Sequence, residues 1–232
     1  MTKWERIGVF DLETTGLDVT RERVVTAFVG VLDANGDVIE SNSWVANPGV
    51  PIPDRAAEVH GYTTERVQAE GRPAADVVAE VLEALRGLFD QGIPVVAYNA
   101  TYDFSLLHFD ALRNGLAPLD EPQPIFDPLI IDKKVDTYRK GSRTLIAACD
   151  TYGVTLDDAH EARSDAVAAG RVLLAIARKY PDDANLQGTP HELHANIARW
   201  AREQAESYAD WAVRNGRNAS RPGPGSWPVY EA

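Results

Sequence analysis

The first fifty residues alternate short apolar runs with turn signals, a pattern typical of an antiparallel meander. Apolar residues dominate 6–12 and 23–32, which predicts two strands. The pair Asn35-Gly36 follows the second run and readily adopts the positive φ angles of a two-residue hairpin turn. Residues 37–46 are therefore expected to return as a third strand.

Beyond the meander the apolar spacing changes to three and four, and helices begin to alternate with short strands. Three closely spaced prolines first predict an irregular segment, which is followed by a short helix from Thr64 to Val67. The remaining expected elements are a helix at 73–89, a strand at 93–98, a helix at 102–114, a strand at 124–129, and helices at 143–152, 159–180 and 190–215.

This order of elements predicts an α/β fold with a mixed five-stranded sheet, flanking helices and an extra C-terminal helix. A crossover to the fourth strand places it beside the first, and ligands bind outside the carboxyl ends of strands where the strand order reverses. We expect Asp11 and Asn99 at that edge. The chain is expected to divide into a main domain at 1–182, a helical appendage at 183–216 and a Pro/Gly-rich tail without regular structure at 217–232.

The composition indicates one sizeable core, because 44% of the 232 residues are hydrophobic. The sequence has no apolar run of about 18 residues and opens without the apolar stretch of a signal peptide, so we expect a cytoplasmic protein. The single cysteine, Cys149, excludes an internal disulfide, and its apolar neighbours predict a buried helix position. His191 and His194 lack the further ligands of a zinc site and are expected to be exposed.

The net charge of -12 argues against a protein that coats duplex nucleic acid, since non-specific affinity comes mostly from Lys and Arg on phosphates. It does not exclude an enzyme that acts on nucleic acid. The segment 132–143 carries five basic and two acidic side chains, a local net charge of +3. Such a segment indicates either a phosphate contact or a solvated polar loop.

The first strand ends in two carboxylates, Asp11 and Glu13, and the turn sequence Thr-Thr-Gly follows at once. Because alternate residues of a strand share a face, the two acids are expected to project side by side. At ~4 Å and an effective dielectric near 20, their repulsion amounts to about 4 kcal/mol. The pair therefore indicates a bound cation or a carboxyl with a raised pKa, and the alternative is a solvated strand end.

Two later element ends also carry acids. Asp103 stands in the first turn of the helix after the fourth strand, where an acid is also a common cap or dipole partner. His160 and Asp165 stand five residues apart at the start of a long helix. Small residues on the same face as Asp165 allow close packing, so this carboxylate is expected to approach the end of the first strand. Taken alone, each feature is typical of an ordinary helix start.

Taken together and in this order, three segments resemble the motifs of a known enzyme family: Phe10-Asp11-Leu12-Glu13-Thr14-Thr15-Gly16-Leu17-Asp18, Asn99-Ala-x-x-Asp103 and His160-x-Ala-x-x-Asp165. They are similar to the three exonuclease motifs of the DEDD superfamily, in the histidine-bearing subgroup (DEDDh) that includes the proofreading subunits of bacterial DNA polymerase III. Val59-His60-Gly61-Tyr62-Thr63 also resembles the segment with which this family grips the terminal nucleotide. The resemblance covers about residues 6–180 and implies a ribonuclease H-like sheet.

The resemblance implies two divalent cations, Mg²⁺ or Mn²⁺, with His160 taking the proton of the attacking water. The implied metal ligands are Asp11, Glu13, Asp103 and Asp165. Oxygen ligands without cysteine also suit these ions on chemical grounds, and histidine side chains exchange protons near neutral pH. The implied nucleotide pocket consists of Thr14, Thr15, Gly16, Leu17, Val59, His60, Asn99 and Tyr102. For His60, a hydrogen-bonded loop residue is the alternative.

The implied activity is hydrolysis from the 3′ end of DNA, at single strands or frayed ends, with release of nucleoside 5′-monophosphates. A 3′-to-5′ exoribonuclease that trims short RNA is the first alternative, since the sequence does not show contacts to a 2′-hydroxyl. The second is a non-catalytic module that binds nucleic acid or protein, although four intact carboxylates speak against it. The expected partners are nucleic-acid 3′ ends and a polymerase or repair protein, without a membrane.

Overall fold

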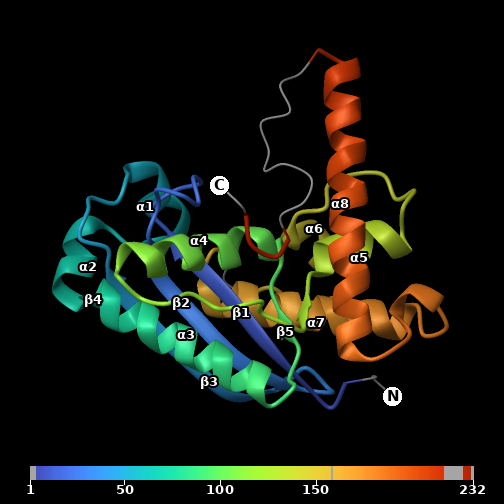
Figure 1. Ribbon diagram of the computed structural model, residues 1–232, viewed down its shortest axis with the longest axis horizontal. Helices are drawn as coiled ribbons and strands as arrows, with labels where there is room; N and C mark the ends of the chain where they lie inside the picture. The colour runs from blue at the N-terminus through green and yellow to red at the C-terminus, as the bar shows by residue number, and fades with distance from the viewer. Residues whose placement is uncertain (1–3, 158, 217–226, 231–232) are drawn as a thin grey trace.

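A mixed six-stranded sheet forms the centre of the protein, with the strand order β4-β3-β2-β1-β5-β6 (Figure 1). The computed structural model describes residues 4–157, 159–216 and 227–230. The strands are β1 (Arg6–Thr14), β2 (Val24–Asp33), β3 (Val38–Asn47), β4 (Arg72–Pro73), β5 (Val95–Val96) and β6 (Ile125–Phe126). The α/β class and all five expected strands are confirmed, and β4 is a two-residue addition that pairs with the end of β3.

The first strand lies in the middle of the sheet. It pairs antiparallel with β2 and parallel with β5, as the crossover argument predicted. The parallel pairing joins Gly8 to Val95 and Val9 to Val96. Because this pairing stops before Asp11, the end of β1 stands beside the point where the chain leaves β5.

Eight α-helices and one 3₁₀ turn occupy the described ranges. They are α1 (Asp54–His60), α2 (Thr64–Glu70), α3 (Ala74–Asp90), α4 (Ala100–Arg113), α5 (Pro128–Val135), α6 (Leu145–Tyr152), α7 (Ala162–Lys179), η1 (Ala184–Leu186) and α8 (Pro190–Arg214). The prediction of an irregular segment after the prolines is wrong at α1. This helix begins after Pro53 and is ended by Gly61, which has a φ of 75°. The helix expected at 64–67 extends to Glu70, and its cap is the side chain of Thr63.

The fifth strand is shorter than predicted. Only Ile125 and Phe126 pair with β5, because Asp127 turns the chain into α5 by accepting a hydrogen bond from the amide of Leu129. Pro128 occupies the first turn of that helix, where its missing N–H costs nothing. The expected strand at 124–129 is therefore a two-residue strand followed by a helix start.

Helices cover both faces of the sheet. Residues Ile7 and Val9 of β1 pack under α7, whereas Phe10 and Leu12 pack under α3 and α4. This alternation places the odd-numbered positions of β1, including Asp11 and Glu13, on the α7 side. Cys149 is buried in α6, as its apolar neighbours predicted.

The last helix joins the same core through its first half. Leu193, Ile197 and Trp200 of α8 belong to the cluster that α7 covers. The expected exposure of His194 is wrong, since its Nδ1 accepts the amide hydrogen of Ile125 at 3.0 Å and burial lowers its pKa. Of the predicted tail, residues 217–226 and 231–232 lie outside the described residues, and 227–230 form neither helix nor strand. Within the described part of the chain, every helix is too short or too polar to cross a membrane.

Candidate active site

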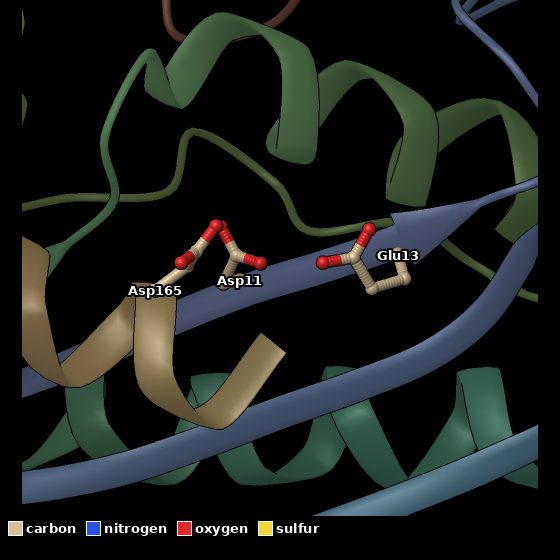
Figure 2. A group of neighbouring side chains, drawn as sticks. All are labelled: Asp11, Glu13 and Asp165. Carbon is tan, nitrogen blue, oxygen red and sulfur yellow. The ribbon is translucent and has the colours of Figure 1, made fainter. Parts of the chain in front are cut away.

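Three carboxylates from distant parts of the chain meet at the end of β1. One oxygen from each of Asp11, Glu13 and Asp165 lies within 4.8 Å of the others. Figure 2 shows the two β1 side chains side by side, with Asp165 reaching toward them from the start of α7. The strand alternation thus places both β1 acids on the face that α7 covers.

Small residues of α7 permit this approach. Ala162, Ala166 and Ala169 are all buried on the face toward the sheet. A Cβ atom added to Gly170 would lie 2.5 Å from Val9 Cγ1 and 2.6 Å from Leu32 Cδ1. Any side chain at 170 would therefore push α7 away from β1 and β2, and Asp165 with it.

Burial and mutual repulsion raise the pKa values of the three carboxyls. For Asp11 burial is the larger cause, and the charges of its acidic neighbours add to it, so that its pKa lies well above the ordinary value. Burial, followed by the charges of Asp165 and Asp103, raises the pKa of Glu13 to about 8. Burial also raises the pKa of Asp165, which His160 partly opposes.

Asp103 is not one of the three acids whose oxygens lie within 4.8 Å of one another. Its side chain is buried in α4 and accepts a hydrogen bond from the amide of Leu12 at 3.2 Å. Burial raises its pKa well above the ordinary value, although that hydrogen bond opposes the rise. Its charge still acts on both β1 acids.

The sequence reasoning missed Asp127, which holds the start of α4. Its carboxylate accepts hydrogen bonds from the amides of Asn99 at 3.1 Å and Ala100 at 2.9 Å. Asn99 itself adopts a left-handed conformation with a φ of 65°. Burial raises the pKa of Asp127 to about 6. An Asp-Pro pair is a common helix start, but nothing in the sequence indicates that the same carboxylate reaches back to α4.

The histidine of the third motif stands at the surface. His160 is exposed on the turn before α7, with a φ of 71°. Its amide donates a hydrogen bond to Asp165 Oδ1 at 3.3 Å. This backbone hydrogen bond therefore ties the turn that carries His160 to Asp165.

Of the residues predicted for the nucleotide pocket, some are exposed and others are held by hydrogen bonds. Leu17 is 82% exposed, and the Tyr102 hydroxyl donates to the carbonyl oxygen of Gly16 at 2.6 Å. Thr14 Oγ1 donates to the same oxygen at 2.8 Å. Thr15, in contrast, is buried and turned away, since its hydroxyl contacts Glu22 and accepts the amide hydrogen of Arg23.

The segment at the end of α1 supplies one exposed and one buried residue. Val59 is half exposed, whereas His60 is buried. The Nδ1 atom of His60 accepts the amide hydrogen of Tyr62 at 3.2 Å. Burial lowers the pKa of His60, and the nearby backbone of Thr14 opposes this shift. His60 therefore lies against the end of β1, at Thr14.

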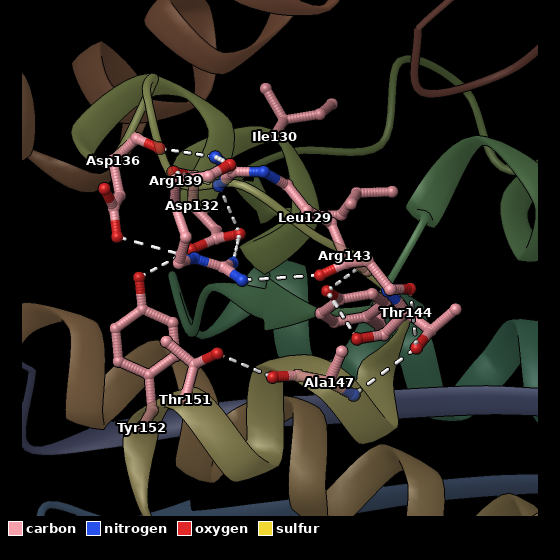
Figure 3. A network of polar contacts seen from close by, with 12 residues as sticks. Leu129, Ile130, Asp132, Asp136, Arg139, Arg143, Thr144, Ala147, Thr151 and Tyr152 are labelled. Carbon is pink, nitrogen blue, oxygen red and sulfur yellow. Dashed lines mark hydrogen bonds and ion pairs between the residues drawn. The ribbon is translucent and has the colours of Figure 1, made fainter.

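The basic segment 132–143 is largely occupied by internal contacts (Figure 3). Asp132 is fully buried, and its carboxylate makes ion pairs with both Arg139 and Arg143. The hydroxyl of Tyr152 donates to the same carboxylate at 2.6 Å. Arg139 and Arg143 thus stabilise the fold, and Lys134 also pairs with Glu203 at 3.8 Å. Fewer basic side chains are therefore available to a phosphate than the sequence suggested.

The donor set fits a divalent cation. Three carboxylates that share one small space are the hard oxygen ligands that Mg²⁺ and Mn²⁺ prefer. Their raised pKa values show the cost of keeping them ionised together, and a cation placed among their oxygens relieves that cost.

Comparison with known sequences identifies related proteins. Residues 9–173 match the RNase T family, described as an exonuclease. The DNA polymerase III PolC-type of Lacticaseibacillus paracasei is 29% identical over 171 residues, which cover 74% of this chain and 11% of that protein. The PolC-type polymerase of Streptococcus thermophilus is 30% identical over 172 residues, with 73% and 11% covered. The chain thus spans about a ninth of the length of these relatives.

Comparison with solved structures finds the same fold. E. coli Exonuclease I in complex with a dA16 oligonucleotide has a TM-score of 0.67 at 18% identity, over 89% of this chain and 45% of the other. Exonuclease X in complex with 5′ overhanging duplex DNA has a TM-score of 0.59 at 17% identity, over 82% and 99%. With the family match over most of its length and the three motifs in place, the chain belongs to the RNase T exonuclease family, within the DEDD superfamily of 3′-to-5′ exonucleases.

Proposed function

We propose that the protein is a metal-dependent 3′-to-5′ exonuclease of the DEDDh subgroup, which removes nucleoside 5′-monophosphates from single-stranded or frayed DNA ends. The observation that carries this proposal is the convergence of Asp11, Glu13 and Asp165 within the residues that match an exonuclease family. Exonuclease I and Exonuclease X were solved in complexes with DNA, which supports DNA as the substrate.

In this proposal the carboxylates of Asp11, Glu13 and Asp165 hold two Mg²⁺ or Mn²⁺ ions, with Asp103 as a further ligand. Such ions stabilise the attacking and leaving oxygens of an in-line displacement. Asp127 keeps the start of α4, and therefore Asp103, in position through the amides of Asn99 and Ala100. With such ions bound, these acids would hold positive charge beside the terminal phosphate.

His160 acts as the proton acceptor in this proposal. Its exposed position before α7 gives it access to a water molecule beside the terminal phosphate. The water oxygen attacks phosphorus, His160 takes its proton, and the bond from phosphorus to the 3′ oxygen of the preceding nucleotide breaks. The leaving oxygen takes a proton from solvent. The products are a nucleoside 5′-monophosphate and a strand that is shorter by one nucleotide.

The terminal nucleotide is proposed to lie over the turn after β1. Exposed Leu17 offers an apolar surface to the base, while Tyr102 holds the turn through the carbonyl of Gly16. His60 lies near the backbone of Thr14 at the end of β1. The remaining pocket residues of the proposal are Thr14, Val59 and Asn99, whereas Thr15 is turned away toward Glu22 and is left out.

The organisation of the chain and its setting are part of the proposal. We assign the exonuclease unit to 1–182 and regard 183–216 as an appendage that docks on it. The similarity to PolC-type polymerases supports a link to DNA replication or repair, with a polymerase or repair protein as partner. A cytoplasmic location is consistent with such a role.

The proposal is tested with single-stranded DNA that carries a 5′ label, incubated with Mg²⁺ or Mn²⁺. We expect a ladder of shortened labelled strands, and EDTA is expected to abolish it. A matched RNA strand of the same sequence separates a deoxyribonuclease from an exoribonuclease. Folded protein that leaves both strands intact with either ion contradicts the proposal, and faster cleavage of RNA assigns the activity to RNA.

A further inference from the structure

A groove of about 1120 Å³ opens between the turn after β1 and the first turns of α4. Leu17 and Tyr102, both assigned to the terminal nucleotide, line one part of it. Pockets for small molecules typically occupy roughly 300–1,000 Å³. The groove is therefore large enough for more of the substrate than the terminal nucleotide.

The groove changes in chemistry along its length. Lys133 and Arg143 line the wall formed by α5 and the segment before α6, and Asp18 faces the groove from the turn after β1. Arg143 is paired with Asp132, so Lys133 is the basic side chain of this wall that we assign to a phosphate preceding the scissile one. The groove thus offers a path for a strand that leads away from Leu17 and Tyr102, the residues assigned to the terminal nucleotide.

A segment from the C-terminus completes the groove. This C-terminal strap, residues 227–230, lies outside the residues that match the family. Trp227 packs against the apolar cluster under α7 and against the one under α3 and α4. Its ring centre is 4.9 Å from that of His194. Val229 packs among the apolar side chains of α3 and α4.

The end of the strap is fixed to the helix that carries Asp103. The amide of Tyr230 donates a hydrogen bond to Ser105 Oγ at 2.7 Å, and Ser105 is fully buried in α4. Tyr230 is half-buried and lines the groove. The backbone of Tyr230 is therefore fixed to α4, and the residue lines the same groove as Leu17 and Tyr102.

We propose that Tyr230 is a substrate-binding residue whose ring stacks on the base of a nucleotide that precedes the 3′-terminal one. The strap thereby adds a base-binding wall that the family match does not include. Stacking on an aromatic ring tolerates any base, because every base has a π face. This inference rests on the proposed exonuclease function and extends it to the strand upstream of the scissile bond.

The test compares a long substrate with a minimal one. Tyr230→Ala is expected to raise KM for single-stranded dodecathymidylate about tenfold, as loss of one base stack does, with kcat unchanged. Hydrolysis of the p-nitrophenyl ester of thymidine 5′-monophosphate is expected to stay at the wild-type rate, since that substrate fills only the terminal pocket. Fluorescence anisotropy with labelled dodecathymidylate and Ca²⁺ is expected to show the same weakening of binding.

The controls separate a lost ring from a damaged fold. Tyr230→Phe keeps the ring and is expected to keep the wild-type KM, whereas Tyr230→Leu keeps bulk and is expected to behave like the alanine variant. Tyr138→Ala removes a tyrosine that is 94% exposed and is expected to change nothing. An unchanged KM in both Tyr230→Ala and Tyr230→Leu overturns the inference. Wild-type protein that cleaves neither substrate overturns the proposed function instead.

Discussion

Asp11 is the acid on which the charges of all the other proposed metal ligands act. Its carboxylate lies near those of Glu13 and Asp165, and the charge of Asp103 also acts on it. His160 stands at the surface and contacts this group through its backbone. Loss of Asp11 should therefore remove ion binding, while loss of the His160 side chain should leave ion binding intact.

Two substitutions test these roles. Asp11→Ala is expected to lower kcat at least about a thousandfold, because bound metal ions contribute several kcal/mol and about 1.4 kcal/mol corresponds to tenfold. His160→Ala is expected to lower kcat by about 10²–10⁴, as loss of a general base does, with Mn²⁺ affinity unchanged by calorimetry. Asp90→Ala, which removes an exposed carboxylate, is the control. Wild-type kcat in either site variant removes that residue from the mechanism.

The raised pKa of Glu13 predicts a pH-dependent stability. The folded protein holds a proton on Glu13 up to a pKa of about 8, whereas its ordinary value is 4.5. Between these values the folded state binds more protons than the unfolded state, so stability falls as pH rises through this window. In EDTA, urea unfolding is expected to show a loss on the order of 2 kcal/mol from pH 5 to pH 8.

Glu13→Gln should weaken this pH dependence, to which the raised pKa values of Asp11 and Asp165 also contribute. Glu58→Gln, on an exposed face of α1, should leave it unchanged. Mg²⁺ or Mn²⁺ should raise the stability of the wild type more at pH 8 than at pH 5, since the ions bind ionised carboxylates in the folded state. A wild-type stability in EDTA that rises from pH 5 to pH 8 contradicts the argument.

At the level of elements, the periodic segments were predictable and the short ones were not. The helices α3, α4, α7 and α8 lie close to their expected ranges, because long apolar periodicity leaves little ambiguity. At α5 an apolar run was read as a strand, although Asp127 followed by Pro128 is a helix start. At α1, Gly61 is a typical helix end, but the three prolines before the helix are typical of an irregular segment and so argued against a helix there.

The close contact of α7 with the sheet predicts a cost for any side chain at Gly170. Gly170→Ala is expected to lower the free energy of unfolding by about 1–3 kcal/mol, because the added methyl overlaps Val9 and Leu32. It should also lower kcat, since α7 carries Asp165. The measurement is urea unfolding together with the DNA cleavage assay.

Gly87 in α3 provides the matched control, because a Cβ there meets nothing within 4 Å. Gly87→Ala is expected to raise stability by about 0.5–1 kcal/mol through helix propensity alone, without an effect on kcat. If Gly170→Ala stabilises the protein as Gly87→Ala does, the tight packing of α7 on β1 is contradicted.

At the scale of the whole molecule, the fold gathers side chains that the sequence keeps far apart. The carboxylates were visible as motif ends, since each stands where an element ends or begins. The strap was not, because Trp227 and Tyr230 show no periodicity and their partners, His194 and Ser105, lie in distant helices. Long-range contacts of irregular segments depend on the completed fold.

The most direct test of the account is anomalous X-ray diffraction from crystals grown with Mn²⁺ and thymidine 5′-monophosphate. We predict Mn²⁺ peaks bounded by the carboxylate oxygens of Asp11, Glu13 and Asp165, with the nucleotide phosphate against them. Crystals of Asp11→Ala grown in the same way should lose these peaks. Nucleotide bound elsewhere, with no manganese among these three carboxylates in the wild type, would contradict the account.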